Sequence, residues 1–194
     1  MAWGGRVDKN LTCFRHCQMR CTRHFSGVKD DPGKAVHQPS KQALFAALHA
    51  HLEAQLASTM AASRDAAAYA TDEESRADSK WDTQGLEASY LAAGQASLAR
   101  ELAAAQETLR AHRPAMTMAQ GAVGVGAFVC CEIEGSVDCY YLVPVAGGIG
   151  LTVEGTEVTT VSLQTPVGRA LRGKRAGESY QLPNGLGGKI TSVA

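Results

Sequence analysis

The sequence predicts an α+β protein built from two modules: an N-terminal antiparallel helical hairpin, or coiled coil, and a C-terminal antiparallel β domain with one short helix. Residues 41–112 are rich in Ala, Leu, Gln and Glu, whereas residues from Ala119 onward are rich in Val, Gly and Thr. Helical and strand signals that are segregated in this way, instead of alternating, are typical of α+β folds. With 194 residues, of which 45% are hydrophobic, the chain can bury a core.

The charge and hydropathy of the chain exclude several classes of protein. The formal net charge is zero, so no overall field attracts nucleic acid or an anionic membrane. The longest apolar windows, such as Ala122 to Val129, are far shorter than the roughly 20 residues of a membrane-spanning helix. The first residues include Arg6 and Lys9 but no apolar stretch of the kind found in secretory signals. We therefore expect a cytoplasmic protein that makes no contact with membranes.

Residues 1–40 contain few aliphatic side chains, several Arg and Lys, and a turn-prone Asp-Asp-Pro-Gly run, so we expect a flexible, basic, disordered leader. Three of the six cysteines, Cys13, Cys17 and Cys21, recur every four residues and would share one helical face, where thiolates could bind zinc. This spacing matches no common zinc finger, so the leader interpretation is preferred.

The other three cysteines, Cys130, Cys131 and Cys139, fall in strand-like segments. Cysteine is among the most buried residue types and packs as a small hydrophobic side chain. We expect these three to be reduced and buried, in keeping with a cytoplasmic protein.

The first predicted helix spans residues 41–68, where Leu and Met recur every four residues from Leu44 to Met60 and form one apolar stripe. The second spans residues 86–111. Two stripes joined by a short connection most simply pair as an antiparallel hairpin, and the alternative, two helices of a globular bundle, lacks a third amphipathic helix. The second helix has a predicted heptad seam with Leu91, Leu98 and Ala105 in one position and Gln95, Leu102 and Leu109 in the other.

The connection between the two helices is acidic, with Asp72, Glu73, Glu74 and Asp78 in the run Thr-Asp-Glu-Glu-Ser-Arg-Ala-Asp. Thr71 and Glu74 have the spacing of a capping box, which predicts a helix that starts at this point. A second candidate break is the Asp-Thr-Gln-Gly run just before the second helix. Acidic residues are also common at helix N-termini because they complement the helix dipole, which is the ordinary explanation for this cluster.

Pro114 predicts the end of the second helix, because proline lacks an amide N–H and clashes with the preceding turn. Residues 113–120 are then a linker, and residues 121–194 form the β domain, in which strand-like runs alternate with turn signals such as Glu-Gly and Gly-Gly. The predicted strands are 123–133, 137–145, 149–153, 157–162, 179–182 and 188–193, with a short helix from Pro166 to Gly173.

The predicted short helix carries the most specific motif of the chain. Its run from Thr165 to Lys174, Thr-Pro-Val-Gly-Arg-Ala-Leu-Arg-Gly-Lys, resembles the C-terminal signature of the bacterial GreA/GreB transcript cleavage factors. In that family a Ser-Pro-x-Gly/Ala-x-Ala/Gly-Leu-x-Gly-Lys helix lies in an FKBP-like β domain, downstream of a helical hairpin. The resemblance covers residues 41–193 and implies the same two-module fold.

The resemblance implies RNA polymerase as the partner. The β domain would dock at the rim of the secondary channel, and the hairpin would reach toward the active centre, with indirect contact to RNA and DNA. It implies no enzyme activity and no cofactor of the chain's own, because the polymerase performs the hydrolysis with Mg²⁺ in its active site. Carboxylates at the hairpin tip lend oxygen ligands to that ion and stimulate cleavage of backtracked transcripts.

Glu74 and Asp78 are the predicted assisting carboxylates, and Asp72 and Glu73 are further tip candidates. The family tip, Gly-Asp-Leu-Lys-Glu-Asn-Ala-Glu-Tyr, is absent as such, and alignment on Trp81 as the aromatic places Glu74 or Ser75 at its Asp and Asp78 at its Glu. This departure leaves open a channel-occupying regulator without cleavage activity.

Arg169, Arg172 and Lys174 are the predicted polymerase-binding residues, as a basic group that could contact an acidic rim. Basic residues near a helix C-terminus are also common for reasons of helix stability alone.

A rival hypothesis is an FKBP-like isomerase or client-binding adaptor with a coiled-coil handle. An isomerase pocket needs several aromatic side chains, and the tail offers only Phe128, Tyr140, Tyr141 and Tyr180. The adjacent pair Tyr140 and Tyr141 would point to opposite faces of a strand, which weakens this hypothesis.

Overall fold

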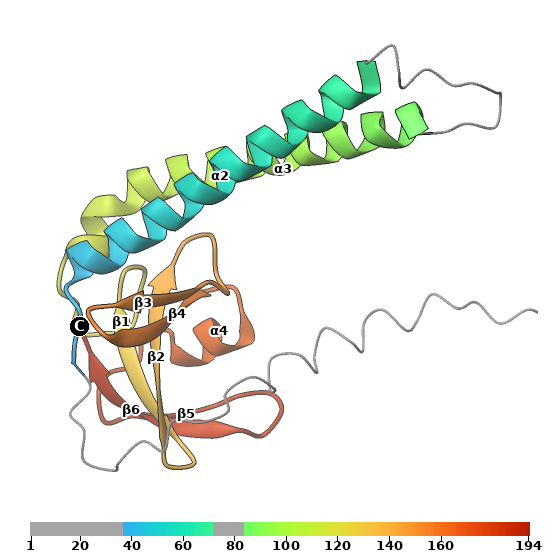
Figure 1. The fold of residues 1–194 in the computed structure, drawn as a ribbon. Coiled ribbons are helices and arrows are strands. Elements are labelled where there is room, and N and C mark those ends of the chain that lie inside the picture. The colour runs from blue at the N-terminus through green and yellow to red at the C-terminus, as the bar shows by residue number, and fades with distance from the viewer. Residues whose placement is uncertain (1–36, 72–83) are drawn as a thin grey trace, which may run out of the picture. The chain divides into compact units, whose positions relative to one another are not determined.

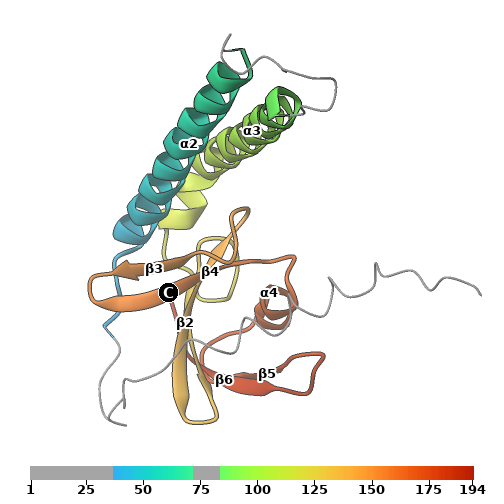
Figure 2. The same ribbon diagram turned by 45° about the vertical axis from the view of Figure 1, so that its right-hand side comes forward.

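The computed structural model describes residues 37–71 and 84–194. Helices α2 (Lys41–Thr71) and α3 (Gln84–Thr117) lie side by side (Figure 1), and a view turned by 45° shows the same pairing (Figure 2). A six-stranded sheet with one short helix follows, so the predicted α+β fold is confirmed. Its elements are β1 (Phe128–Ile133), β2 (Ser136–Val143), β3 (Gly150–Val153), β4 (Thr156–Ser162), α4 (Pro166–Leu171), β5 (Ser179–Gln181) and β6 (Gly187–Val193).

The strand order in the sheet is β3-β4-β2-β1-β6-β5, so β2 and β1 form its centre. The pairs β1–β2, β3–β4 and β5–β6 are antiparallel hairpins, as predicted, and β1 also pairs antiparallel with β6. The pairing of β2 with β4 is parallel, which the sequence did not predict. It is possible because the chain between these strands includes the whole of β3, and a parallel pair needs a crossover of about a dozen residues or more.

Two tight turns set the registers of the sheet. Glu134 and Gly135 connect β1 to β2, and Glu154 and Gly155 connect β3 to β4. All four residues have positive φ angles, between 51° and 84°. Two successive residues with positive φ define the type I′ turn, whose twist matches that of the flanking strands. The turn formed by Glu134 and Gly135 therefore places residues of β1 and β2 opposite each other in a fixed register.

The sheet separates two hydrophobic cores. On one face, Phe128, Tyr141 and Val143 pack with the N-terminal part of α2 and the C-terminal part of α3. On the other face, Val129 and Leu142 pack with residues of α4 and the outer strands. Alternate residues of the central strands thus contribute to different cores, as the two-residue period of a strand requires.

Helix α3 continues through Pro114 to Thr117, so the prediction that it ends at Pro114 is wrong, as is the start of the predicted linker at residue 113. Met116, two residues beyond the proline, is fully buried. The Tyr141 hydroxyl donates a hydrogen bond of 3.0 Å to the Met116 carbonyl oxygen, and Thr117 Oγ1 donates to the Arg113 carbonyl oxygen at 2.9 Å. These contacts with the last turn outweigh the single backbone hydrogen bond that Pro114 cannot make.

Residues 37–40, which precede α2, are hydrogen-bonded to the β domain. The prediction that residues 1–40 are disordered is therefore wrong for these last four residues. Thr156 Oγ1 donates to the His37 carbonyl oxygen at 2.7 Å. Ser40 caps α2, because its Oγ accepts from the Ala43 amide at 3.2 Å, and its own amide donates to the Glu154 carboxylate at 3.1 Å. The rest of the predicted leader, residues 1–36, lies outside the described residues, together with the candidate thiolates Cys13, Cys17 and Cys21.

Within residues 37–71 and 84–194, no helix combines the length and hydropathy needed to cross a membrane.

Candidate functional site

The acidic segment, residues 72–83, connects the end of α2 to the start of α3. Helix α2 ends at Thr71 and α3 begins at Gln84, and the Tyr69 hydroxyl donates to Gln84 Oε1 at 3.1 Å across the two helices. Both ends of segment 72–83 are therefore joined at the same end of the helix pair. The predicted tip carboxylates Asp72, Glu73, Glu74 and Asp78 lie outside the described residues.

Thr71 is the last residue of α2. Its Oγ1 donates to the carbonyl oxygens of Ala67 and Ala68, both at 3.1 Å, as a threonine in the last turn of a helix does. The predicted capping box of Thr71 with Glu74 stays a prediction, because Glu74 lies outside the described residues.

The seam between the helices is only partly the predicted one. Gln95, Leu102 and Leu109, predicted for one heptad position, are half-buried or buried as expected. Of the residues predicted for the other position, Ala105 is half-buried, but Leu91 and Leu98 are 56% and 45% exposed and were assigned wrongly. The residues one further along the chain, Ala92, Ala99 and Gln106, are half-buried or buried instead.

Small residues explain this shift of one residue. Ser63 Oγ of α2 donates to the Ala92 carbonyl oxygen of α3 at 3.2 Å, a contact that requires the two helix backbones to be close. Ala66 is buried opposite this region, and Ala88 and Ala92 are half-buried. Leucine at these seam positions would hold the backbones apart, so alanine and serine occupy the seam and leucine lies outside it.

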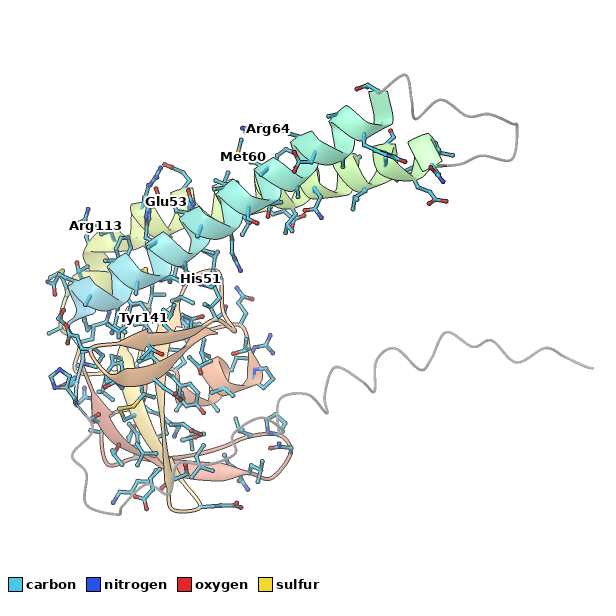
Figure 3. All side chains as sticks on the ribbon, viewed as in Figure 1. His51, Glu53, Met60, Arg64, Arg113 and Tyr141 are labelled. Atoms are coloured by element: carbon cyan, nitrogen blue, oxygen red, sulfur yellow. A yellow bond between two sulfur atoms is a disulfide. The ribbon has the colours of Figure 1, made fainter. Side chains whose placement is uncertain are left out.

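Large apolar side chains are exposed on the half of the helix pair next to segment 72–83, which we call the distal half (residues 56–71 and 84–101). Tyr90 is 70% exposed, and Met60 and Arg64 lie on the outer side of α2 (Figure 3). The exposed large apolar residues of the distal half are Met60, Tyr69, Leu86, Tyr90, Leu91 and Leu98.

A surface groove of about 590 Å³ runs between the helices in this distal half. Ala66 and Ala88 form part of its floor, and Asp65 and Glu87 place one carboxylate from each helix at its sides. The described end of the helix pair thus already combines apolar surface with carboxylates, directly beside the acidic segment.

The opposite half of the pair, which we call the base (residues 41–55 and 102–117), is anchored to the sheet. Leu44, Leu48 and Leu52 of α2 are buried in the core that includes Phe128 and Tyr141, and Figure 3 shows Tyr141 between the sheet and the helices. The ammonium group of Lys41, at the start of α2, donates to the Met118 carbonyl oxygen beyond the end of α3. Burial lowers the pKa of Lys41.

Helix α4 shows why the motif residues occur where they do. Thr165 Oγ1 accepts from the Gly168 amide at 3.1 Å as the N-cap, and Pro166 is the first helical residue. A Cβ at Gly168 would lie 2.2 Å from the Ser162 carbonyl oxygen, so only glycine fits there. Leu171 is fully buried, and Gly173 has a φ of 75° just past the helix end. These residues fix the helix against the sheet.

The predicted polymerase-binding residues surround α4. Arg169 and Arg172 are exposed and Lys174 is half-buried. Within the described part of the chain, none of the three forms an ion pair with a carboxylate. Arg169 also lines a groove of about 440 Å³ that Pro166 and Leu182 border. The β domain thus presents basic side chains that are available to a partner.

The four aromatic residues of the tail do not form a common pocket. Phe128 and Tyr141 are buried in the core under the base of the helix pair, whereas Tyr140 and Tyr180 belong to the core on the other face of the sheet. The prediction that Tyr140 and Tyr141 point to opposite faces is confirmed. Burial raises the pKa of Tyr141, in keeping with a hydroxyl that serves only to bond the Met116 carbonyl.

A cysteine pair in the centre of the sheet was not predicted. Cys130 of β1 and Cys139 of β2 form a disulfide, with their Cα atoms 4.2 Å apart, so the expectation that all strand cysteines are reduced is wrong for these two. It holds for Cys131, which is free and buried, and whose pKa is raised to about 11 mainly by that burial. The sequence feature that could have predicted this disulfide is the Glu-Gly turn. A two-residue turn at 134–135 places residue 130 opposite residue 139.

No cluster of three or more metal-ligating side chains occurs among residues 37–71 and 84–194.

Comparisons with known proteins give structural neighbours only. No protein-family model matches the chain, and no curated protein sequence matches it. The solved structures that match include three with 18% sequence identity. The first is the GreA factor homolog 1 (Gfh1) protein of Thermus thermophilus, where the match covers 75% of this chain and 94% of that chain with a TM-score of 0.30. The second is Thermus aquaticus Gfh1, where the match covers 80% of this chain and 96% of that chain with a TM-score of 0.30. The third, a structure of the transcription factor Gfh1, matches over 76% and 93% with a TM-score of 0.31. At this identity and TM-score the likenesses assign neither a family nor a function.

Proposed function

We propose that this chain is an RNA polymerase-binding transcription elongation factor of the GreA/GreB kind. Its helix pair enters the secondary channel of the polymerase, and its tip carboxylates, Glu74 and Asp78, act on the Mg²⁺-dependent cleavage of backtracked transcripts. The chain itself is not a catalyst and holds no cofactor, since the ion belongs to the polymerase active site.

One observation carries the proposal. The two helices remain paired as far as the Tyr69–Gln84 hydrogen bond, so segment 72–83, which contains five carboxylates, is attached at the end of the pair, away from the anchored base. Carboxylate oxygens are the ligands that Mg²⁺ prefers, and a paired-metal site stabilises both the attacking and the leaving oxygen in phosphodiester hydrolysis. An acidic segment carried in this way can be delivered into a narrow site on another molecule.

Two further features support the proposal. The distal half exposes large apolar side chains, such as Tyr90 and Leu91, that the fold of this chain does not use, as expected of a surface that another protein covers. The β domain presents Arg169, Arg172 and Lys174 without intramolecular ion pairs among the described residues, and these can meet an acidic rim. The rival isomerase hypothesis loses support because Phe128 and Tyr180 lie in different cores.

The test compares transcript shortening by a backtracked polymerase with the wild-type protein and with a Glu74→Ala/Asp78→Ala variant. Loss of two oxygen ligands should reduce the stimulated cleavage rate by about 10- to 100-fold while polymerase binding is retained. Glu157→Ala is the matched control, because it removes an exposed carboxylate from β4, far along the chain from the tip. Its cleavage rate should equal that of the wild type.

The outcomes separate the versions of the proposal. Absence of any binding to core polymerase overturns it. Binding without transcript shortening identifies a channel-occupying regulator, the version that the departure of the tip from the family pattern leaves open. Equal activity of the wild type and the double variant rejects Glu74 and Asp78 as the assisting pair and directs the same experiment to Asp72 and Glu73.

A further inference from the structure

The disulfide joins the two central strands of the sheet. Cys130 of β1 lies directly opposite Cys139 of β2, and their Cα atoms are 4.2 Å apart. In an antiparallel pair, directly opposite residues with Cα atoms this close are the ones whose side chains approach most nearly. The type I′ turn at Glu134 and Gly135 imposes this register, so the two sulfurs face each other whether or not they are bonded.

The pair faces the helices. Cys130 and Cys139 belong to the same core as Leu48 and Leu109 of the helix base, on the face of the sheet that carries Tyr141. The neighbouring Cys131 points to the other face and packs in the core of α4. Two of the three strand cysteines therefore lie where the β domain holds the helix pair, and the third does not.

The oxidation state of the pair changes the space it needs. Bonded sulfurs lie about 2.05 Å apart, whereas two thiols require van der Waals separation. Protein interiors are close-packed, so a change of this size at a central position shifts the side chains around it. The side chains around Cys130 and Cys139 include those on which the base of the helix pair rests.

We propose that Cys130 and Cys139 form a reversible dithiol–disulfide site that controls how firmly the base of the helix pair is held on the sheet. The inference goes beyond the proposed function and does not rest on it. On oxidation, each thiol loses a proton and the pair gives two electrons to a small disulfide such as oxidised glutathione. The S–S bond between the cysteines forms as the bond of the small disulfide breaks, releasing two small thiols.

The route to this site runs through the β1–β2 turn. Cys139 is 7% exposed and Cys130 is 3% exposed, whereas Cys131 is fully buried. Residues 134–138, next to Cys139, are exposed, so local opening of this end of the hairpin is enough to admit a small thiol. Cys131 has no such route, and its pKa near 11 keeps it protonated and unreactive. It is therefore a matched control within the same strand.

The first part of the test determines whether the bond forms and breaks in the folded protein. The full-length chain is equilibrated in mixtures of oxidised and reduced glutathione, alkylated and cut with a protease specific for glutamate. Glu132 and Glu134 lie between the two cysteines, so the two fragments stay linked only through a disulfide. We expect the linked species to rise and fall with the glutathione ratio in the wild type and in Cys131→Ala, and to be absent in Cys130→Ala. A link that never forms, or one that reduced glutathione cannot break without denaturant, overturns the proposal.

The second part measures hydrogen–deuterium exchange in the oxidised and the reduced wild type, so that it does not depend on a variant that folds. Reduction should speed amide exchange at residues 41–52 of α2 by about tenfold and leave residues 60–71 unchanged, because only the base contacts the cysteine core. Cys131→Ala should show the same difference between its two redox states. Equal exchange at residues 41–52 in both states shows that the bond does not act on the helix pair and overturns the proposal.

Discussion

The base and the distal half of the helix pair are built by different rules. In the base, large side chains such as Leu48 and Leu109 are fully buried and contact the sheet. In the distal half, the seam consists of small residues such as Ser63 and Ala92, and the large residues Tyr90 and Leu91 are exposed. The comparison teaches that one continuous pair of helices can be anchored at one end by its core and leave large apolar side chains exposed at the other.

The largest expected effect comes from removal of a base leucine. Leu48→Ala should lower the free energy of unfolding by about 2 to 5 kcal/mol, because it leaves a cavity in the core shared with the sheet. Leu91→Ala, the same change at a residue that is 56% exposed, should stay within about 0.5 kcal/mol of the wild type. Denaturant unfolding monitored by circular dichroism gives both values. Similar losses for the two variants would show that the halves are not built differently.

A smaller effect is expected from overfilling the distal seam. Ala92→Leu should destabilise the protein by about 1 to 3 kcal/mol, because the added atoms push apart backbones that Ser63 and Ala92 hold in hydrogen-bonding contact. Ala93→Leu adds the same atoms at an exposed position one residue away and serves as the control. Thermal unfolding compares the two variants. A greater loss for Ala93→Leu would place the seam in another register.

The smallest effect is expected at the link between the sheet and the end of α3. Tyr141→Phe removes the hydroxyl that donates to the Met116 carbonyl oxygen and should cost about 1 kcal/mol, because the ring still fills its place in the core. Tyr90→Phe removes a hydroxyl from a residue that is 70% exposed and should leave the free energy of unfolding unchanged. Chemical denaturation resolves a difference of this size, and equal values for the two variants would mean that the bond to Met116 adds nothing.

Turns made most of the β domain predictable from sequence. The Glu-Gly pairs at 134–135 and 154–155 signal two-residue turns, and β1 and β4 end at Ile133 and Ser162, as predicted. The start of the first strand was predicted wrongly, because β1 begins at Phe128 and residues 123–127 are not in a strand. The parallel pairing of β2 with β4 was not predictable in the same way, because it depends on contacts between strands that are not consecutive.

Helix boundaries and faces were less predictable, because tertiary contacts decide them. Pro114 is a strong local stop signal, but the burial of Met116 two residues later carries α3 past it. Leu91 and Leu98 are more hydrophobic than Ala92 and Ala99. A prediction from hydropathy therefore assigned the two leucines to the seam, whereas the alanines that follow them are the half-buried residues.

For the candidate site, the sequence predicted the helices that flank the acidic segment. Paired helices that meet at Tyr69 and Gln84 agree with a hairpin that carries the acidic segment at its end, whereas Glu74 and Asp78 remain predictions because they lie outside the described residues. The disulfide was predictable in principle, since turn position and cysteine spacing together pair Cys130 with Cys139.

The attachment of α2 to the β3–β4 turn has a consequence for biosynthesis. The Ser40 amide donates a hydrogen bond to the Glu154 carboxylate, and the Thr156 hydroxyl donates one to the His37 carbonyl oxygen. Contacts at the start of α2 therefore join residues more than a hundred positions apart. At a translation rate of about 5 to 20 residues per second, the ribosome needs several seconds to make the intervening chain. The leucines of the base therefore leave the ribosome several seconds before the strands with which they share a core.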